Sequence, residues 1–250
     1  MATLTVNPGG GADYTTISAA IAAAGSTDII DIQANIDEPV TLNKNVAKIY
    51  SSNENPIIWT NTNSNDETLK FLSGLTQAIE FESIIFNKTT TGDPTIGIST
   101  LNSNAQFSFY KCTFKYSGTS TCEIFKSAQN MGANNKLIFD RCNFDGSDGN
   151  NLREGLHFVN SVTAIGELTI KSCIFQFLDN GSADGAIDLA STGTVTNGKI
   201  SRCTFANNNI GITVRSAIPI VGCAFVNNTD DIDYAGGSQT DGNFTYTAFD

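Results

Sequence analysis

Apolar and polar positions along the chain follow a pattern that recurs about every 30 residues. In each repeat, apolar residues stand five and three positions before a cysteine, two polar residues follow them, and a Cys-x-Phe frame comes next. Successive side chains of a strand point to opposite faces, so one unbroken strand could not keep both apolar sets inside. The pattern therefore predicts two short strands that meet at a corner formed by the polar pair, such as Asp140-Arg141 or Ser201-Arg202.

The repeat predicts the architecture of the whole chain. Its steps from cysteine to cysteine are 30, 31, 30 and 20 residues, and a third apolar segment lies between successive frames, as in Leu156-His157-Phe158 and Ile187-Asp188-Leu189. Self-similarity at such a period indicates one supersecondary unit stacked on itself. Parallel strands joined by long crossovers wind right-handed. We expect an all-β, single-stranded right-handed parallel β-helix with three strands per coil and about eight coils.

One domain is expected over residues 1–250. A strand and a helical cap are predicted within 1–28, coils over 29–235 and a C-terminal cap over 236–250. The helix is expected within 15–25, with a threonine as N-cap, Gly25 as its C-terminal stop, and an apolar face lying over the first coil.

Cysteine and phenylalanine side chains are expected to form an internal ladder. Equivalent residues on adjacent coils have parallel Cβ vectors, which suit a disulfide poorly, so we expect free buried thiols. Neither a Cys-x-x-Cys motif nor a Cys/His cluster is present, and no metal site is predicted. The expected ladder residues are Cys112, Cys142, Cys173, Cys203, Cys223, Phe114, Phe144, Phe175, Phe205 and Phe225.

Composition and charge narrow the choice of partner. The formal net charge of −11 disfavours nucleic acid, and it disfavours anionic polysaccharide unless calcium or a local basic patch intervenes. No run of 18 apolar residues is present, so no membrane partner is predicted. The first residues do not resemble a secretory signal, which favours synthesis in the cytoplasm without a signal peptide. Whether a signal or a partner domain has been removed stays open.

The segment 11–21, Gly-Ala-Asp-Tyr-Thr-Thr-Ile-Ser-Ala-Ala-Ile, and the Cys-x-Phe-x-Asn-Asn frames together resemble the pectin lyase-like superfamily of right-handed parallel β-helices. The opening segment is similar to the one that starts many pectinesterase, pectate-lyase-like and phage tailspike β-helices. The resemblance spans the whole chain and implies the fold. It does not assign a function, because the superfamily includes lyases, hydrolases, esterases, adhesins and virion proteins.

Motifs of the superfamily's enzymes are matched only in part. Asn228-Thr229-Asp230-Asp231 resembles a polygalacturonase motif, but Asn207-Asn208 repeats its start, which favours a ladder of turns. The pectinesterase nucleophile segment resembles 231–236, which also aligns with the strand around Asp188. The remaining weak catalytic candidates are Asp188, Arg215 and Asp233, expected as an outward stack in which the arginine neutralises exposed carboxylates. This stack could hold Ca²⁺ only if further oxygens converged on it, so no cofactor is predicted.

Binding residues are predicted on the loops between the Phe position and the third strand. Solenoid insertions on one face often form its interaction surface. Arg141 and Arg202, at equivalent corners, are either a basic stripe for an acidic ligand or simply solvent-exposed. His157 points outward if Leu156 aligns with Ile187, and inward in the alternative register. The candidate binding residues are Asp145, Asp148, Asp179, Asp184, Tyr116 and Phe177.

These observations favour a non-enzymatic structural or binding protein. The hypothesis is a phage virion component, such as a decoration or tail protein on the virion surface, or a surface glycan-binding module. Its partners would be other virion or surface subunits, or a glycan, and the resemblance to trimeric virion proteins suggests a homo-oligomer. The alternative is a polysaccharide lyase or hydrolase that acts on uronic-acid-containing glycans.

Overall fold

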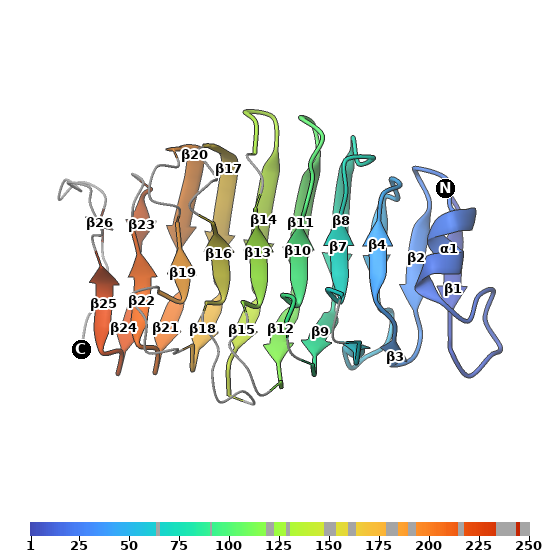
Figure 1. The fold of residues 1–250 in the computed structure, drawn as a ribbon, viewed down its shortest axis with the longest axis horizontal. Helices are drawn as coiled ribbons and strands as arrows, with labels where there is room; N and C mark the ends of the chain where they lie inside the picture. The colour runs from blue at the N-terminus through green and yellow to red at the C-terminus, as the bar shows by residue number, and fades with distance from the viewer. Residues whose placement is uncertain are drawn as a thin grey trace.

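The computed structural model is an elongated solenoid of three parallel β-sheets, with strands stacked in chain order from one end to the other (Figure 1). It describes residues 1–63, 66–90, 92–118, 123–128, 131–147, 154–159, 164–178, 185–189, 194–214, 218–233 and 244–245.

Each coil contributes one strand to each sheet, which we name A, B and C in the order in which the chain visits them. Sheet A has ten strands: β1 (Thr3–Val6), β2 (Ile29–Ile32), β5 (Lys48–Tyr50), β8 (Ala78–Glu82), β11 (Gln106–Tyr110), β14 (Lys136–Asp140), β17 (Ala164–Lys171), β20 (Thr194–Ser201), β23 (Ile220–Val221) and β26 (Phe244–Thr245). Sheet B has eight: β3 (Ile36–Asp37), β6 (Ile57–Asn61), β9 (Ile84–Lys88), β12 (Thr113–Tyr116), β15 (Asn143–Asp145), β18 (Ile174–Gln176), β21 (Thr204–Ala206) and β24 (Ala224–Val226). Sheet C also has eight: β4 (Val40–Leu42), β7 (Leu69–Phe71), β10 (Ile96–Ile98), β13 (Phe125–Ser127), β16 (Leu156–Phe158), β19 (Ile187–Asp188), β22 (Ile210–Thr213) and β25 (Asp230–Asp233).

The predicted fold class is confirmed: the chain is an all-β parallel solenoid with three strands per coil. This is the architecture that the resemblance to pectin lyase-like β-helices implies. Within the described residues, the single helix is α1 (Ile17–Ala23), and no helix is long and apolar enough to cross a membrane.

The corner between sheets A and B is a single residue in the left-handed backbone region. It falls immediately before the cysteine position, at the second residue of the predicted polar pair. Arg141 has φ 58°, Arg202 has φ 56° and Gly222 has φ 62°. This conformation turns the chain within one residue and allows the apolar side chains before and after it to face the same core. Ser83, Lys111 and Ser172 occupy equivalent corners.

Aromatic rings and thiols form the interior. Ring centroids in the column Phe86, Phe114, Phe144, Phe175, Phe205 and Phe225 lie 5.6, 4.7, 4.4, 5.1 and 4.9 Å apart, and successive planes are nearly parallel. Full burial of each ring contributes on the order of 2–3 kcal/mol. The five predicted ladder cysteines are free and buried. Cys122 lies outside the described residues.

The N-terminal end is covered by α1, as Figure 1 shows. Thr16 is the N-cap, and its side chain accepts a hydrogen bond from the Ala19 amide at 3.2 Å. Ile17, Ala20 and Ile21 are buried. The helix ends directly before the predicted stop at Gly25, because Ala24 is the C-cap and its backbone is extended (ψ 145°).

Candidate functional site

The outward side of sheet C carries a cluster of ionisable side chains centred on His157. Leu156 pairs with Ile187 and His157 pairs with Asp188, which settles the open question of direction: His157 lies in the outward row. Lys126 on β13 precedes it in that row, and Thr213 on β22 and Asp233 on β25 follow Asp188. The parallel register therefore brings side chains from distant parts of the sequence onto adjacent coils.

Both nitrogens of the His157 ring face carboxylates. Nδ1 lies 3.3 Å from Glu123 Oε1 and 3.5 Å from Glu154 Oε2, and Nε2 lies 3.8 Å from Asp188 Oδ2. The histidine side chain is 17% exposed, whereas those of Glu154 and Asp188 are 0% and 3% exposed. A histidine held between carboxylates has a fixed ring orientation.

Glu123 also binds Lys126, whose Nζ lies 2.9 Å from Oε1. Burial by itself would raise the pKa of the Glu123 carboxyl, but the hydrogen bonds from His157 and Lys126 outweigh it and lower that pKa to about 2. Glu123 is therefore an anion throughout the physiological pH range.

The sequence contains a signal for this cluster that the apolar repeat does not capture. A glutamate stands three residues before the outward residue of the third strand in Glu67-x-x-Lys70, Glu123-x-x-Lys126 and Glu154-x-x-His157. The first two are ion pairs of 3.2 and 2.9 Å, and the third places a histidine where the others have lysine. Periodic Glu-x-x-Lys or Glu-x-x-His spacing ahead of a strand could have indicated the site.

Gly97, on the coil between these two Glu–Lys pairs, leaves room for a carboxylate. A Cβ atom at this position would lie 2.4 Å from Glu67 Oε1, so a larger residue would displace the Glu67 side chain. A small pocket of about 160 Å³ opens here and is lined by Glu67, Gly97 and Lys126 among others.

The predicted catalytic stack is only partly as expected. Asp188 and Asp233 do lie in one outward row, with Thr213 on the coil between them. Asp188, however, is 2% exposed, so the expectation of an exposed acidic ladder is wrong for this residue. The carboxylate faces His157, a partner that sequence reasoning did not assign to it. Arg215 lies outside the described residues.

Two predicted binding residues are buried and therefore not available to a ligand. The Tyr116 ring is fully enclosed because it lies on the inward row of sheet B, where it pairs with Lys88. Asp145 is 7% exposed; its Oδ1 accepts a hydrogen bond from the Ser147 amide at 3.0 Å, and its Oδ2 lies 3.5 Å from Lys115 Nζ. Burial alone would raise the Asp145 pKa, yet these contacts hold it below its ordinary value. Asp145 thus closes a turn.

Phe177, another candidate binding residue, is exposed, with 45% of its surface accessible. Asp148, Asp179 and Asp184 lie outside the described residues.

The polygalacturonase-like motif belongs to a ladder of turns. Asn228 Nδ2 donates to Phe205 O at 3.0 Å, while Asn208 Nδ2 donates to Phe175 O at 3.0 Å and to Asn228 Oδ1 at 3.1 Å. Equivalent asparagines thus bind backbone carbonyl groups of the preceding coil and one another. The match at 228–231 is explained by this repeated turn.

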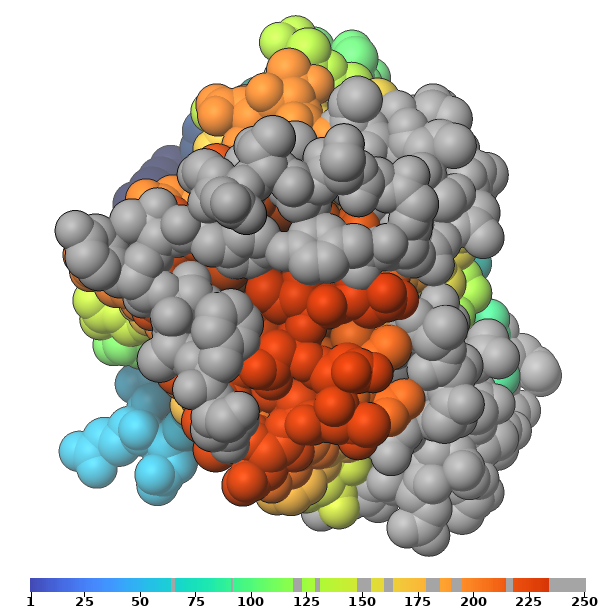
Figure 2. Space-filling model, turned by 90° about the vertical axis from the view of Figure 1, so that its left-hand side faces the viewer, coloured from blue at the N-terminus to red at the C-terminus, as the bar shows by residue number. Residues whose placement is uncertain are grey.

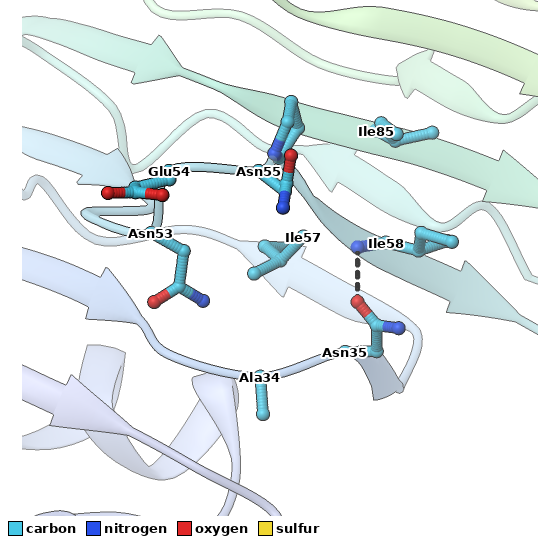
Figure 3. Close-up of a pocket in the computed structure, with 9 residues that line it drawn as sticks. Ala34, Asn35, Asn53, Glu54, Asn55, Ile57, Ile58 and Ile85 are labelled. Atoms are coloured by element: carbon cyan, nitrogen blue, oxygen red, sulfur yellow. Dashed lines mark hydrogen bonds between the residues drawn. The ribbon is translucent and has the colours of Figure 1, made fainter.

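A larger pocket, of about 480 Å³, lies at the corner of sheets A and B in the early coils (Figure 3). Its apolar lining comes from Ile57, Ile58 and Ile85, and the segment 53–56 forms one side. Asn35 Oδ1 accepts a hydrogen bond from the Ile58 amide at 2.8 Å, drawn as the dashed line in Figure 3. This pocket contains none of the residues of the His157 cluster, so we do not assign it the chemistry of that cluster.

The cluster also meets the distance requirement for a cation site, since ligand atoms of Glu123, Glu154 and His157 all lie within 4.8 Å of one another. The Lys126 ammonium, however, already binds Glu123. A metal ion at this position would therefore be repelled by the charge of Lys126.

Comparisons with known proteins give little beyond the fold. No family model matches the chain, and no curated protein matches it. Among solved structures it is similar to pectin methylesterase from carrot, with 15% sequence identity and a TM-score of 0.43 over 99% of this chain and 81% of that one.

Proposed function

We propose that the protein is a carbohydrate-active β-helix that transfers protons at His157 during cleavage of a polysaccharide. The observation that carries this proposal is that both ring nitrogens of one half-buried histidine face carboxylates from neighbouring coils. The sequence favoured a non-enzymatic protein partly because no catalytic group with an orienting partner was visible. In the structure His157 has carboxylate partners of this kind, and we therefore favour the alternative, a polysaccharide lyase or hydrolase.

The chemistry follows from the position of each group. The His157 imidazole accepts a proton from the sugar or from water and returns it to the leaving oxygen. Glu123, held as an anion by Lys126, stabilises the imidazolium from the Nδ1 side. Nε2 lies 3.8 Å from Asp188 Oδ2, too far for a hydrogen bond, and is therefore the nitrogen that takes up and returns the proton. In a lyase the proton leaves the carbon next to the uronate carboxylate, a C=C bond forms and the glycosidic C–O bond breaks. In a hydrolase the oxygen of water bonds to the anomeric carbon as the glycosidic C–O bond breaks.

The test is turnover of a panel of uronic-acid and neutral polysaccharides, with and without calcium. We expect at least one substrate to be cleaved, and His157→Gln to lower kcat by about 10²–10⁴-fold, the usual contribution of a general acid–base group. Glu123→Gln should also lower kcat and shift its pH profile, because an orienting anion is lost.

Glu67→Gln is the matched control. It removes the carboxylate of an equivalent Glu–Lys pair that has no histidine, and should leave kcat unchanged. Absence of turnover on every polymer would overturn the enzymatic proposal, as would full activity of His157→Gln.

The second candidate is the non-enzymatic structural or binding protein, with virion or surface subunits as partners. The nearly complete burial of Glu154 and Asp188 favours it, because an enclosed ionic network can serve cohesion alone. Light scattering that shows a stable trimer, together with a lack of turnover, would support this candidate. A monomer that cleaves a glycan would contradict it.

A further inference from the structure

The outward face of sheet A has a concave basic surface near the C-terminal end of the solenoid. We call it the basic groove. Its volume is about 580 Å³, within the range of small-molecule binding sites. The lining residues are Thr169, Lys171, Lys199, Ser201, Arg202, Val221 and Gly222. Figure 2 looks onto this end of the molecule, where the last described coil is drawn in red.

The hollow results from what occupies the last corner. Arg202 stands at the corner of its coil, and the next coil has Gly222 at the equivalent position. Glycine contributes no side chain there, and β23 is only two residues long. On earlier coils, a corner side chain such as that of Lys111 or Arg141 fills the corresponding space. Next to Arg202, on the side of the following coil, this space therefore stays open.

Lys199 and Arg202 differ from the other cations of this face, including Lys171, which is the third cation of the groove. Lys136 binds Glu167 at 3.0 Å, and Lys171 lies 3.6 Å from Asp140. Within the part of the chain that the structure describes, no carboxylate pairs with Lys199 or Arg202. The protein carries a net charge of −11, so two cations that no described carboxylate pairs with distinguish this groove from the generally acidic surface.

Arg141 shows what an occupied corner looks like. Its Nη1 donates to the Tyr110 hydroxyl at 2.8 Å, the guanidinium lies 5.4 Å from the Tyr110 ring centroid, and Nε lies 3.9 Å from Asp140 Oδ1. Arg202 is preceded by Ser201, so no adjacent carboxylate neutralises it. The two arginines that the sequence suggested as one basic stripe thus have different roles.

We propose that the basic groove binds a short oligosaccharide bearing anionic groups. The Arg202 guanidinium matches the planar geometry of a carboxylate or sulfate, Lys199 supplies a second charge, and the Thr169 and Ser201 hydroxyls suit sugar hydroxyl groups. The net charge of −11 opposes a long polyanion, so the groove suits a segment of a few sugar units. The net charge disfavours an anionic polysaccharide unless a local basic patch is present, and the basic groove is such a patch.

Calorimetric titration with three tetrasaccharides tests the assignment: sulfated chondroitin, unsulfated chondroitin, which carries carboxylates only, and neutral chito-oligosaccharide. We expect at least one of the first two to bind, more weakly as NaCl is raised, and the neutral one not to bind. Arg202→Gln and Lys199→Gln should each weaken binding about tenfold, since a charge-assisted hydrogen bond is lost.

Arg141→Gln is the matched control and should keep the affinity of the unmodified protein. Equal loss in Arg141→Gln, no loss in Arg202→Gln, binding of the neutral tetrasaccharide, or tighter binding of a single-stranded DNA oligomer would each overturn the proposal. So would failure of both anionic tetrasaccharides to bind. These readouts are independent of turnover at His157, which lies on sheet C, so this proposal and the enzymatic one can fail separately.

Discussion

At the scale of single residues, the neighbours of each side chain follow from the register of the sheets. Inward positions such as Cys142 and Phe144 recur with the repeat, and one register accounts for all of them. Two partners of His157, Glu123 and Asp188, come from other coils, and only the pairing of Leu156 with Ile187 brings Asp188 beside it. An alternating pattern specifies which side a residue faces once the register is known, but not which outward residues become buried.

Acid stability should depend on Glu123. The pKa of its carboxyl is about 2 in the folded protein against an ordinary 4.5, so it favours folding above pH 4.5, and this contribution is lost as pH falls towards 2. The contribution amounts to roughly 3 kcal/mol at neutral pH. Urea unfolding should be measured between pH 2 and 7. The free energy of unfolding should fall less steeply with decreasing pH for Glu123→Gln than for the unmodified protein. Parallel curves would contradict this pKa.

At the scale of elements, the unit of structure is a pair of strands joined by a left-handed corner. The sequence placed this corner correctly because the change of parity between apolar positions requires a bend. It did not reveal a second left-handed position after β18, β21 and β24, at Phe177 (φ 57°), Asn207 (φ 56°) and Asn227 (φ 52°). Asparagine tolerates this conformation, whereas an aromatic residue does so at a cost of about 1 kcal/mol or more.

Phe177→Asn should therefore stabilise the protein by about 0.5–1 kcal/mol. The exposed ring loses little burial, and the new residue matches its equivalents on the next two coils. Denaturant midpoints at constant m-value are the measurement. Asn207→Phe is the reciprocal variant and should destabilise by a similar amount; a loss of stability in Phe177→Asn would show that the ring makes contacts that outweigh the backbone cost.

At the scale of the whole molecule, the stacked interior makes the coils interdependent. Each thiol donates to carbonyl groups near it, as Cys142 does to Phe109 O at 3.3 Å, and the rings form one column through the coils. Burial raises the pKa of the Cys112 thiol to about 12. Hydrogen bonding with Cys173, together with burial, raises that of Cys203 to about 12.

Thiol alkylation should consequently report global opening. In a Cys122→Ser background at pH 8, we expect iodoacetamide to modify none of the five ladder cysteines in the native protein and all five in urea, because the folded coils enclose all five thiols. Mass spectrometry counts the adducts. Rapid labelling of Cys223 alone would indicate that the last coil opens separately.

The equivalence of the corners at Arg141, Ser172 and Arg202 has a genetic consequence. Recombination between two such points would remove or duplicate about 30 codons and still leave ring facing ring across the junction. The length of this protein can therefore change in whole-coil increments, while the helix at one end is inherited intact.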